Sequence, residues 1–247
     1  MTQETRIAVF RPDDERLAEA VELLESLGAD PVADPMLAVE PAGASPREDA
    51  EFTVLTSKTG VELARKDGWE PSGTVCAIGD RTARALREAG YEVDLIPEEF
   101  SSEGLVRALA EEVAGTRVEV ARSDHGSSVL TDGLNDAGAY VHETVLYRLI
   151  RPPGSGVSAE RAAAGELEGA LFTSSLTVEH FLAAATERGL REEATAGLSS
   201  GIVGAIGEPT RATAERAGIG VDVVPAVADF EKLACGVVER AAPSYHD

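Results

Sequence analysis

Small hydroxyl side chains recur at four places in the chain where they could help to bind an anion. Thr56-Ser57 and Thr173-Ser174 each follow a short apolar run, and Thr82 and Thr210 each follow an Ile-Gly pair. If these runs are parallel strands, the hydroxyls lie at strand carboxyl ends and in first helical turns, where backbone N–H groups bind carboxylates. Helix capping is the alternative role, because Ser and Thr are common N-caps. Their recurrence in both halves of the chain favours binding.

Motifs for nucleotide binding, nucleophilic catalysis and metal binding are missing. The glycines of Gly201–Gly207 lack the spacing of a dinucleotide-binding loop, and no P-loop occurs. The GxSxG pattern at Gly197–Gly201 precedes an apolar run, whereas a nucleophile elbow follows a strand, so no nucleophile elbow is present. No two histidines stand at metal-ligand spacing, and we interpret all four as surface or structural residues: His125, His142, His180 and His246. The sequence therefore favours an enzyme without cofactor or metal, or a binding protein.

Short Val, Ile and Leu runs alternate with helical stretches along the whole chain. The first run is Arg6–Phe10, and a helical apolar stripe follows it over Asp14–Leu27, where Gly28 ends it. We expect further strands at Phe52–Thr56, Thr74–Ile78, Val93–Leu95, Arg117–Ala121, Tyr140–Leu146, Ala170–Thr173, Ile202–Ile206 and Val221–Val224. This alternation predicts an α/β fold with parallel sheets that are covered by helices on both faces.

Two internal repeats divide the chain into four quarters. Val75–Gly79 matches Val203–Gly207, and the match continues downstream at a constant offset. A fainter repeat relates Arg6–Arg11 to Arg117–Arg122. The quarters therefore have the order a, c, a′, c′. Either each a pairs with the c that follows it, or the central c and a′ form one domain and the outer quarters form the other.

The loosest stretches of the chain favour the second pairing. Pro35–Ala50 and Ile150–Gly165 are rich in Pro, Gly and Ser, whereas only Ala114-Gly115 separates the central quarters. We therefore predict two domains with a cleft between them: an outer domain of residues 1–34 and 152–247, an inserted central domain of residues 41–147, and linkers at 35–40 and 148–151.

The chain is strongly acidic. Its 44 Asp and Glu residues and 22 Lys and Arg residues give a formal net charge of -22, which opposes binding to nucleic acids and anionic membranes. The acids are spread through periodic apolar sequence, so we interpret them as solvated helix faces adapted to high salt, where charge repulsion is screened. We expect a cytoplasmic protein, because no signal peptide is visible and Cys76 and Cys235 form no disulfide framework.

An ordered set of short motifs resembles the uroporphyrinogen-III synthase family along nearly the whole chain. The set comprises Phe10-Arg11-Pro12, Leu55-Thr56-Ser57, Ala77-Ile78-Gly79 with Thr82, Val93–Glu99 with Ser102–Leu105, Arg122–Gly126, Val145–Arg148, Phe172-Thr173-Ser174 and Ala205–Thr210. Two places depart from the family pattern, since Ser175-Leu176 follows Ser174, where the family often has Ser-Pro-Ser, and Lys58-Thr59 follows Ser57.

The resemblance implies a fold, a reaction and a partner. The fold is two flavodoxin-like domains joined by a pair of strands, with the central domain inserted. The reaction is that of a cofactor-free lyase of tetrapyrrole biosynthesis, on the way to heme, siroheme and cobalamin. It closes hydroxymethylbilane to uroporphyrinogen III with loss of water and inversion of the last pyrrole ring. The enzyme would be a monomer that contacts hydroxymethylbilane synthase only transiently.

The resemblance also assigns roles to individual residues. Tyr147 matches the family's tyrosine, and a phenol, protonated at neutral pH, could assist hydroxide departure as a general acid; packing at the linker is its alternative role. Thr82, Thr210, Ser57 and Ser174 would bind substrate. The cations nearest the expected strand ends are Arg11, Arg122, Arg81 and Arg148. We take Arg11 and Arg122 as candidates for binding the substrate's carboxylates, with surface ion pairs as the alternative.

Two other functions fit the same features. A non-catalytic two-lobe protein that binds a small molecule would share the fold, but such proteins usually carry an export signal or an effector domain. A different cofactor-free isomerase or lyase would need a strong general base. We find neither a histidine nor a pair of carboxylates placed for that role.

Overall fold

A computed structural model of the chain describes residues 5–242. The chain forms two compact units: unit 1 takes the chain up to Ala38 and from Ile150 onward, and unit 2 takes Val39–Leu149. Both divisions fall inside the stretches that the sequence marks as linkers, 35–40 and 148–151. Within residues 5–242, no helix combines the length and the apolar character that a membrane span requires.

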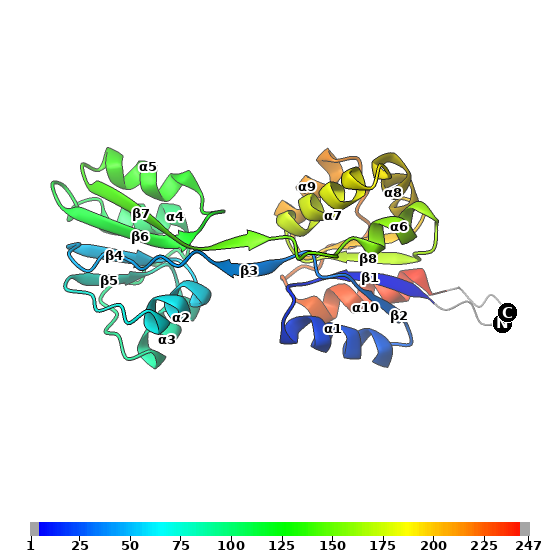
Figure 1. The fold of residues 1–247 in the computed structure, drawn as a ribbon, viewed down its shortest axis with the longest axis horizontal. Helices are drawn as coiled ribbons and strands as arrows, with labels where there is room; N and C mark the ends of the chain where they lie inside the picture. The colour runs from blue at the N-terminus through cyan, green and yellow to red at the C-terminus, as the bar shows by residue number, and fades with distance from the viewer. Residues whose placement is uncertain (1–4, 243–247) are drawn as a thin grey trace. The chain divides into compact units, whose positions relative to one another are not determined.

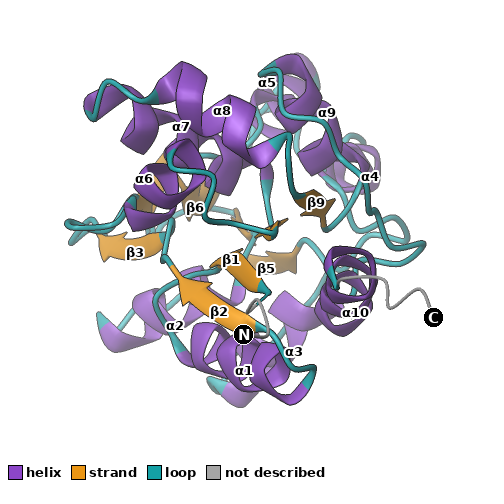
Figure 2. Ribbon diagram, turned by 90° about the vertical axis from the view of Figure 1, so that its right-hand side faces the viewer, coloured by secondary structure: helices purple, strands orange, loops and turns teal. Residues whose placement is uncertain are grey.

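Unit 1 is built on a parallel sheet with the strand order β2-β1-β8-β9 (Figure 1). The strands are β1 (Arg6–Phe10), β2 (Asp30–Ala33), β8 (Gly169–Phe172) and β9 (Ile202–Ala205). Helices α1 (Glu15–Ser26) and α10 (Phe230–Ala241) pack on one face. The other face carries α6 (Val157–Ala163), α7 (Ser175–Glu187), α8 (Arg191–Leu198) and α9 (Glu208–Arg216). Figure 2 shows α1 on one side of β1 and α6, α7 and α8 on the other.

Unit 2 has the same layered build, with the strand order β3-β7-β6-β4-β5. The strands are β3 (Ala38–Pro41), β4 (Phe52–Leu55), β5 (Thr74–Ala77), β6 (Arg117–Ser123) and β7 (Tyr140–Ile150). Helices α2 (Lys58–Lys66) and α3 (Asp80–Glu88) pack on one face. Helices α4 (Ser102–Leu109) and α5 (Ser128–Asp136) pack on the other. Aliphatic side chains make up most of both layers, and Trp69, Tyr147 and Phe52 add aromatic rings.

The strand neighbours decide how the four repeated quarters pair. In unit 1, β1 of the first quarter pairs in parallel with β8 of the last quarter. In unit 2, β4 of the second quarter pairs in parallel with β6 of the third. The central quarters thus share one sheet and the outer quarters share the other. The repeated strands take equivalent places in the orders β2-β1-β8-β9 and β7-β6-β4-β5.

Four edge segments differ from the expectations drawn from sequence. The runs at Val93–Leu95 and Val221–Val224 form only single bridges, Cys76↔Leu95 and Gly204↔Val223. In each run an aspartate side chain, Asp94 or Asp222, accepts a backbone N–H from the neighbouring strand, at 2.8 Å and 2.9 Å, in place of a longer ladder. Strands β2 and β3 are not expected from the sequence, because each is short and carries a proline, as edge strands can.

Asp34 links the end of β2 to the first turn of α6. Its carboxylate is buried and accepts the backbone N–H groups of Gly156 and Ser158, both at 2.8 Å, as well as the Ser158 hydroxyl. Since an asparagine amide offers only one acceptor oxygen, we expect Asp34→Asn to lower the free energy of unfolding by about 2 kcal/mol. Urea denaturation measures this loss. The exposed Asp13→Asn is the control, and an equal loss in both variants would contradict the assignment.

Cys76 lies in the core of unit 2 on β5. Burial raises the pKa of its thiol to about 12, and the thiolate is the reactive form. We therefore expect iodoacetamide at pH 8 to leave Cys76 unmodified in the native protein and to modify it in urea. Peptide mass spectrometry reads both states. Native alkylation of Cys76 as fast as that of the half-buried Cys235 would show that the prediction is wrong.

Candidate active site

The hydroxyl residues at the strand ends divide into caps and buried first-turn residues. Ser57 is the N-cap of α2 and accepts the N–H of Gly60 at 3.0 Å. Ser174 is the N-cap of α7 and forms a capping box with Thr177. Both serines therefore act as helix caps, which was the alternative to ligand binding. Capping leaves each hydroxyl less free to bind a ligand.

Thr82 and Thr210 do not cap a helix. They are buried in the first turns of α3 and α9, which begin after Gly79 and Gly207. No side chain caps either of these two helices at its N-terminus. The first N–H groups of both helices therefore lack a side-chain acceptor, which is the condition under which a helix start can bind an anion.

Tyr147 and Ser57 are 90 residues apart in the sequence of unit 2, and the fold brings their side chains together. Tyr147 lies on β7, is only 6% exposed, and donates its hydroxyl hydrogen bond to the Ser57 Oγ at 3.0 Å. Its ring packs with Leu146 and the α2 side of the sheet. The phenol is thus fixed at the N-terminus of α2, next to the carboxyl end of β4, where a ligand of a parallel sheet is expected.

Arg11 lies at the carboxyl end of β1, and its guanidinium carbon is 4.2 Å from the centroid of the Phe230 ring. Its Nε is buried and has no hydrogen-bond partner within residues 5–242. Burial and, to a smaller extent, the charge of Arg16 lower the pKa of Arg11 from its ordinary value. The side chain remains a cation at neutral pH. It lines a cavity of about 300 Å³ together with Thr173, Ser174 and Phe230.

The other arginines are placed differently. Arg122 is 4% exposed and donates from Nε to Glu143 at 2.7 Å and from Nη1 to the Ser127 carbonyl. Arg148 lies 4.0 Å from Glu40 on the surface of unit 2, and Arg81 is exposed in the first turn of α3. Among these candidates, only Arg11 faces a cavity without an acidic partner in the part of the chain that the structure describes.

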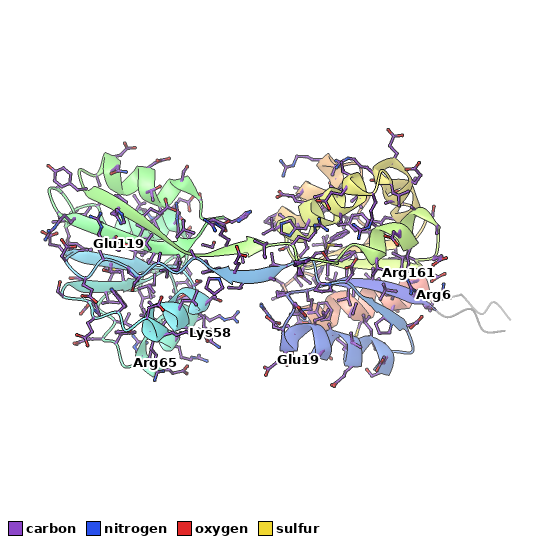
Figure 3. All side chains as sticks on the ribbon, viewed as in Figure 1. Arg6, Glu19, Lys58, Arg65, Glu119 and Arg161 are labelled. Carbon is purple, nitrogen blue, oxygen red and sulfur yellow. The ribbon has the colours of Figure 1, made fainter. Side chains whose placement is uncertain are left out.

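A larger cavity, of about 780 Å³, lies at the amino ends of β6 and β7, away from the strand carboxyl ends. It is lined by His142 and by the buried Glu119 (Figure 3), and the two side chains are hydrogen-bonded at 2.7 Å. Over residues 5–242, no group of three or more His, Cys, Asp or Glu side chains is arranged to hold a metal ion.

Phe230 lines the same cavity as Arg11 and contacts that side chain, and sequence reasoning did not single it out. It is the first residue of α10, after the N-cap Asp229, and its partner Arg11 is in the first quarter of the chain. No spacing or motif connects the two residues. Only the packing of α10 against β8 and β9, next to β1 in the sheet, brings the ring beneath the guanidinium.

Comparison with known proteins identifies the family. A family model described as "Uroporphyrinogen-III synthase HemD" matches residues 18–235. A Methanothermobacter thermautotrophicus protein whose name assigns it to the uroporphyrinogen-III synthases is 34% identical over 230 residues, which cover 86% of this chain and 90% of that protein. The uroporphyrinogen-III synthase of Synechococcus elongatus is 34% identical over 146 residues, 54% of each chain.

Solved structures share the fold at low identity. A uroporphyrinogen III synthase structure from Thermus thermophilus has a TM-score of 0.68 at 19% identity and covers 96% of this chain and 98% of its own. The Helicobacter pylori enzyme has a TM-score of 0.62 at 13% identity, covering 96% and 99%. These likenesses show the α/β fold with parallel sheets. The family model that matches residues 18–235 and the 34% identical Methanothermobacter relative establish that the chain belongs to the uroporphyrinogen-III synthase family.

Proposed function

We propose that this protein is a lyase that converts hydroxymethylbilane into uroporphyrinogen III. The observation that carries the proposal is the position of the Tyr147 hydroxyl, at the carboxyl end of the unit 2 sheet and 3.0 Å from Ser57, in a chain that belongs to this family. A phenol carries one donor hydrogen, so Tyr147 can donate a proton or a hydrogen bond to a leaving hydroxide when its O–H turns from Ser57 to the substrate.

The proposed reaction balances without a cofactor. The terminal hydroxyl of the bilane leaves as water when it takes up a proton, and an electrophilic azafulvene remains. The distal pyrrole attacks this centre through its substituted carbon and forms a spiro intermediate. That intermediate fragments, and the ring recloses in the inverted orientation with loss of a proton. Holding the two ends in the conformation that leads to the spiro bond selects this product through orientation.

Several residues support the reaction in separate roles. The substrate's carboxylates are negatively charged, and the uncapped starts of α3 and α9, with Thr82 and Thr210, offer N–H groups to them. Arg11 supplies a positive charge in unit 1. Ser57 orients Tyr147 and, like Ser174, caps a helix. Because its Nε and Nη1 donors are already engaged, Arg122 positions the loop after β6 rather than contacting substrate.

A coupled assay tests the proposed function. Hydroxymethylbilane is generated in place by hydroxymethylbilane synthase in molar KCl, which screens the net charge of -22. The products are oxidised and separated into porphyrin isomers I and III. We expect isomer III to dominate, because unassisted ring closure gives isomer I. Isomer I alone, from protein whose circular dichroism shows that it is folded, would overturn the proposal in favour of a non-catalytic two-lobe binding protein.

A further inference from the structure

The internal repeat places two arginines at equivalent positions. Arg11 follows β1 in unit 1 and Arg122 stands near the end of β6 in unit 2, and the surrounding residues Arg6–Arg11 and Arg117–Arg122 match each other. If both arginines served the same purpose, their surroundings would be alike. The structure shows two different environments.

The Arg122 side chain is buried inside unit 2 and held by hydrogen bonds. Its guanidinium is held by Glu143 and by the carbonyl of Ser127. Gly126 packs directly against it, since a Cβ on that glycine would lie 2.3 Å from the Arg122 Cδ. The Arg122 guanidinium is thus buried and already paired with a carboxylate, so its charge is not available to a ligand.

Arg11 has none of these partners. Within residues 5–242, no carboxylate lies within ion-pairing distance of its guanidinium, and the neighbouring Arg16 is paired with Asp14 instead. Beneath the guanidinium lies the Phe230 ring. At the constant offset of the repeat, the residue of unit 2 that corresponds to Phe230 is Ser102, so the aromatic support is confined to unit 1.

We propose that Arg11 binds a carboxylate group of acetate or propionate size in the cavity of unit 1, and that Phe230 is the residue that positions Arg11 for it. That this carboxylate is a substrate side chain rests on the proposed function. The planar guanidinium matches the two oxygens of a carboxylate. A cavity of about 300 Å³ has room for a short acid, and the Thr173 and Ser174 side chains line its wall.

The Phe230 ring determines the orientation of the Arg11 guanidinium. A guanidinium stacked on a ring keeps its edge free for in-plane hydrogen bonds, whereas one without support can rotate into solvent. Phe230→Leu keeps an apolar side chain but removes the ring face. The loss of a cation–π contact is worth about threefold to thirtyfold in affinity.

Steady-state kinetics test the positioning role. We expect Phe230→Leu to raise KM about tenfold with kcat within about twofold of the unchanged protein, since the contact is made in the bound ground state as well. Phe230→Tyr restores KM because it keeps the ring. Arg117→Gln, which removes an exposed cation at the amino end of β6 that is paired with Glu51, is the charge control and leaves KM unchanged. A KM for Phe230→Leu equal to that of the control overturns the positioning role.

A binding measurement separates this proposal from the proposed function. The Nε–H of Arg11 is buried, so its NMR signal is protected from exchange and can be followed in the ¹⁵N-labelled full chain. We expect sodium propionate to shift this signal in the unchanged protein and not in Phe230→Leu, and sodium chloride at equal ionic strength to leave it in place.

Each outcome has one meaning for the carboxylate site. A propionate-specific shift supports the site even if the coupled assay yields only isomer I, in which case the proposed function alone is wrong. No shift, or an equal shift with chloride, overturns the site even if isomer III is formed.

Discussion

Replacing Tyr147 by phenylalanine is expected to lower kcat for the formation of isomer III by about 10²-fold, the lower end of the range for general-acid catalysis. The variant removes only the hydroxyl that donates to Ser57, so the ring still packs against Leu146 and the sheet. Bilane that is not processed closes spontaneously to isomer I. The fraction of isomer I should therefore rise as kcat falls, and both quantities are read from the coupled assay.

Tyr91→Phe is the matched control for this experiment. Tyr91 also belongs to unit 2, and its hydroxyl donates to the Trp69 carbonyl at 2.9 Å. Loss of this bond should lower the free energy of unfolding by about 1 kcal/mol and leave the isomer ratio unchanged. If Tyr147→Phe keeps its full kcat, or if both variants lose activity equally, the hydroxyl of Tyr147 is not the proton donor.

The repetition of the chain made its architecture predictable from sequence. Short apolar runs and the two repeats predict parallel α/β sheets, which the fold and its structural relatives confirm. The edges of the sheets were harder to predict. At Val93–Leu95 and Val221–Val224, backbone pairing is limited to a single bridge, and an aspartate side chain accepts a further backbone N–H of the neighbouring strand. A hydropathy pattern does not predict this side-chain contact.

The site was less predictable than the fold, and the two arginines show why. Arg11 and Arg122 occupy matching positions in matching sequence, yet one contacts Phe230 and the other contacts Glu143. Those partners come from α10 and β7 and are distant in sequence. Residue type and spacing identify which groups can carry charge, whereas tertiary packing decides which of them stays available to a ligand.

The serines and threonines illustrate the same limit at shorter range. Sequence alone allows Ser57 and Thr82 the same two roles, capping or binding. The structure separates them, because Ser57 caps α2 while α3 begins at a glycine that has no capping side chain. Ser57 directly precedes α2, whereas Thr82 is the third residue of α3, so the residue at which each helix begins decides the role. Helix ends are the part of a helix that sequence predicts least well.

Gly197→Ala is the substitution with the largest expected effect on stability. Helices α6 and α8 cross so closely that a Cβ on Gly197 would lie 1.7 Å from the carbonyl oxygen of Ala162. That oxygen belongs to the backbone and cannot rotate away, so the helices must separate. We expect the free energy of unfolding to fall by about 3 kcal/mol, at the upper end for overpacking, although alanine favours a helix by about 1 kcal/mol. The urea midpoint measures the change.

Gly236→Ala in α10 is the control that isolates the cause. Its Cβ would meet only a methyl group of Val223, at 3.0 Å, and a side chain can yield by a few tenths of an ångström. The helix propensity gained is the same in both variants, so a change of less than about 1 kcal/mol is expected here. The difference between the two variants thus measures the cost of separating α6 from α8. Equal effects would mean that this crossing is looser than the structure has it.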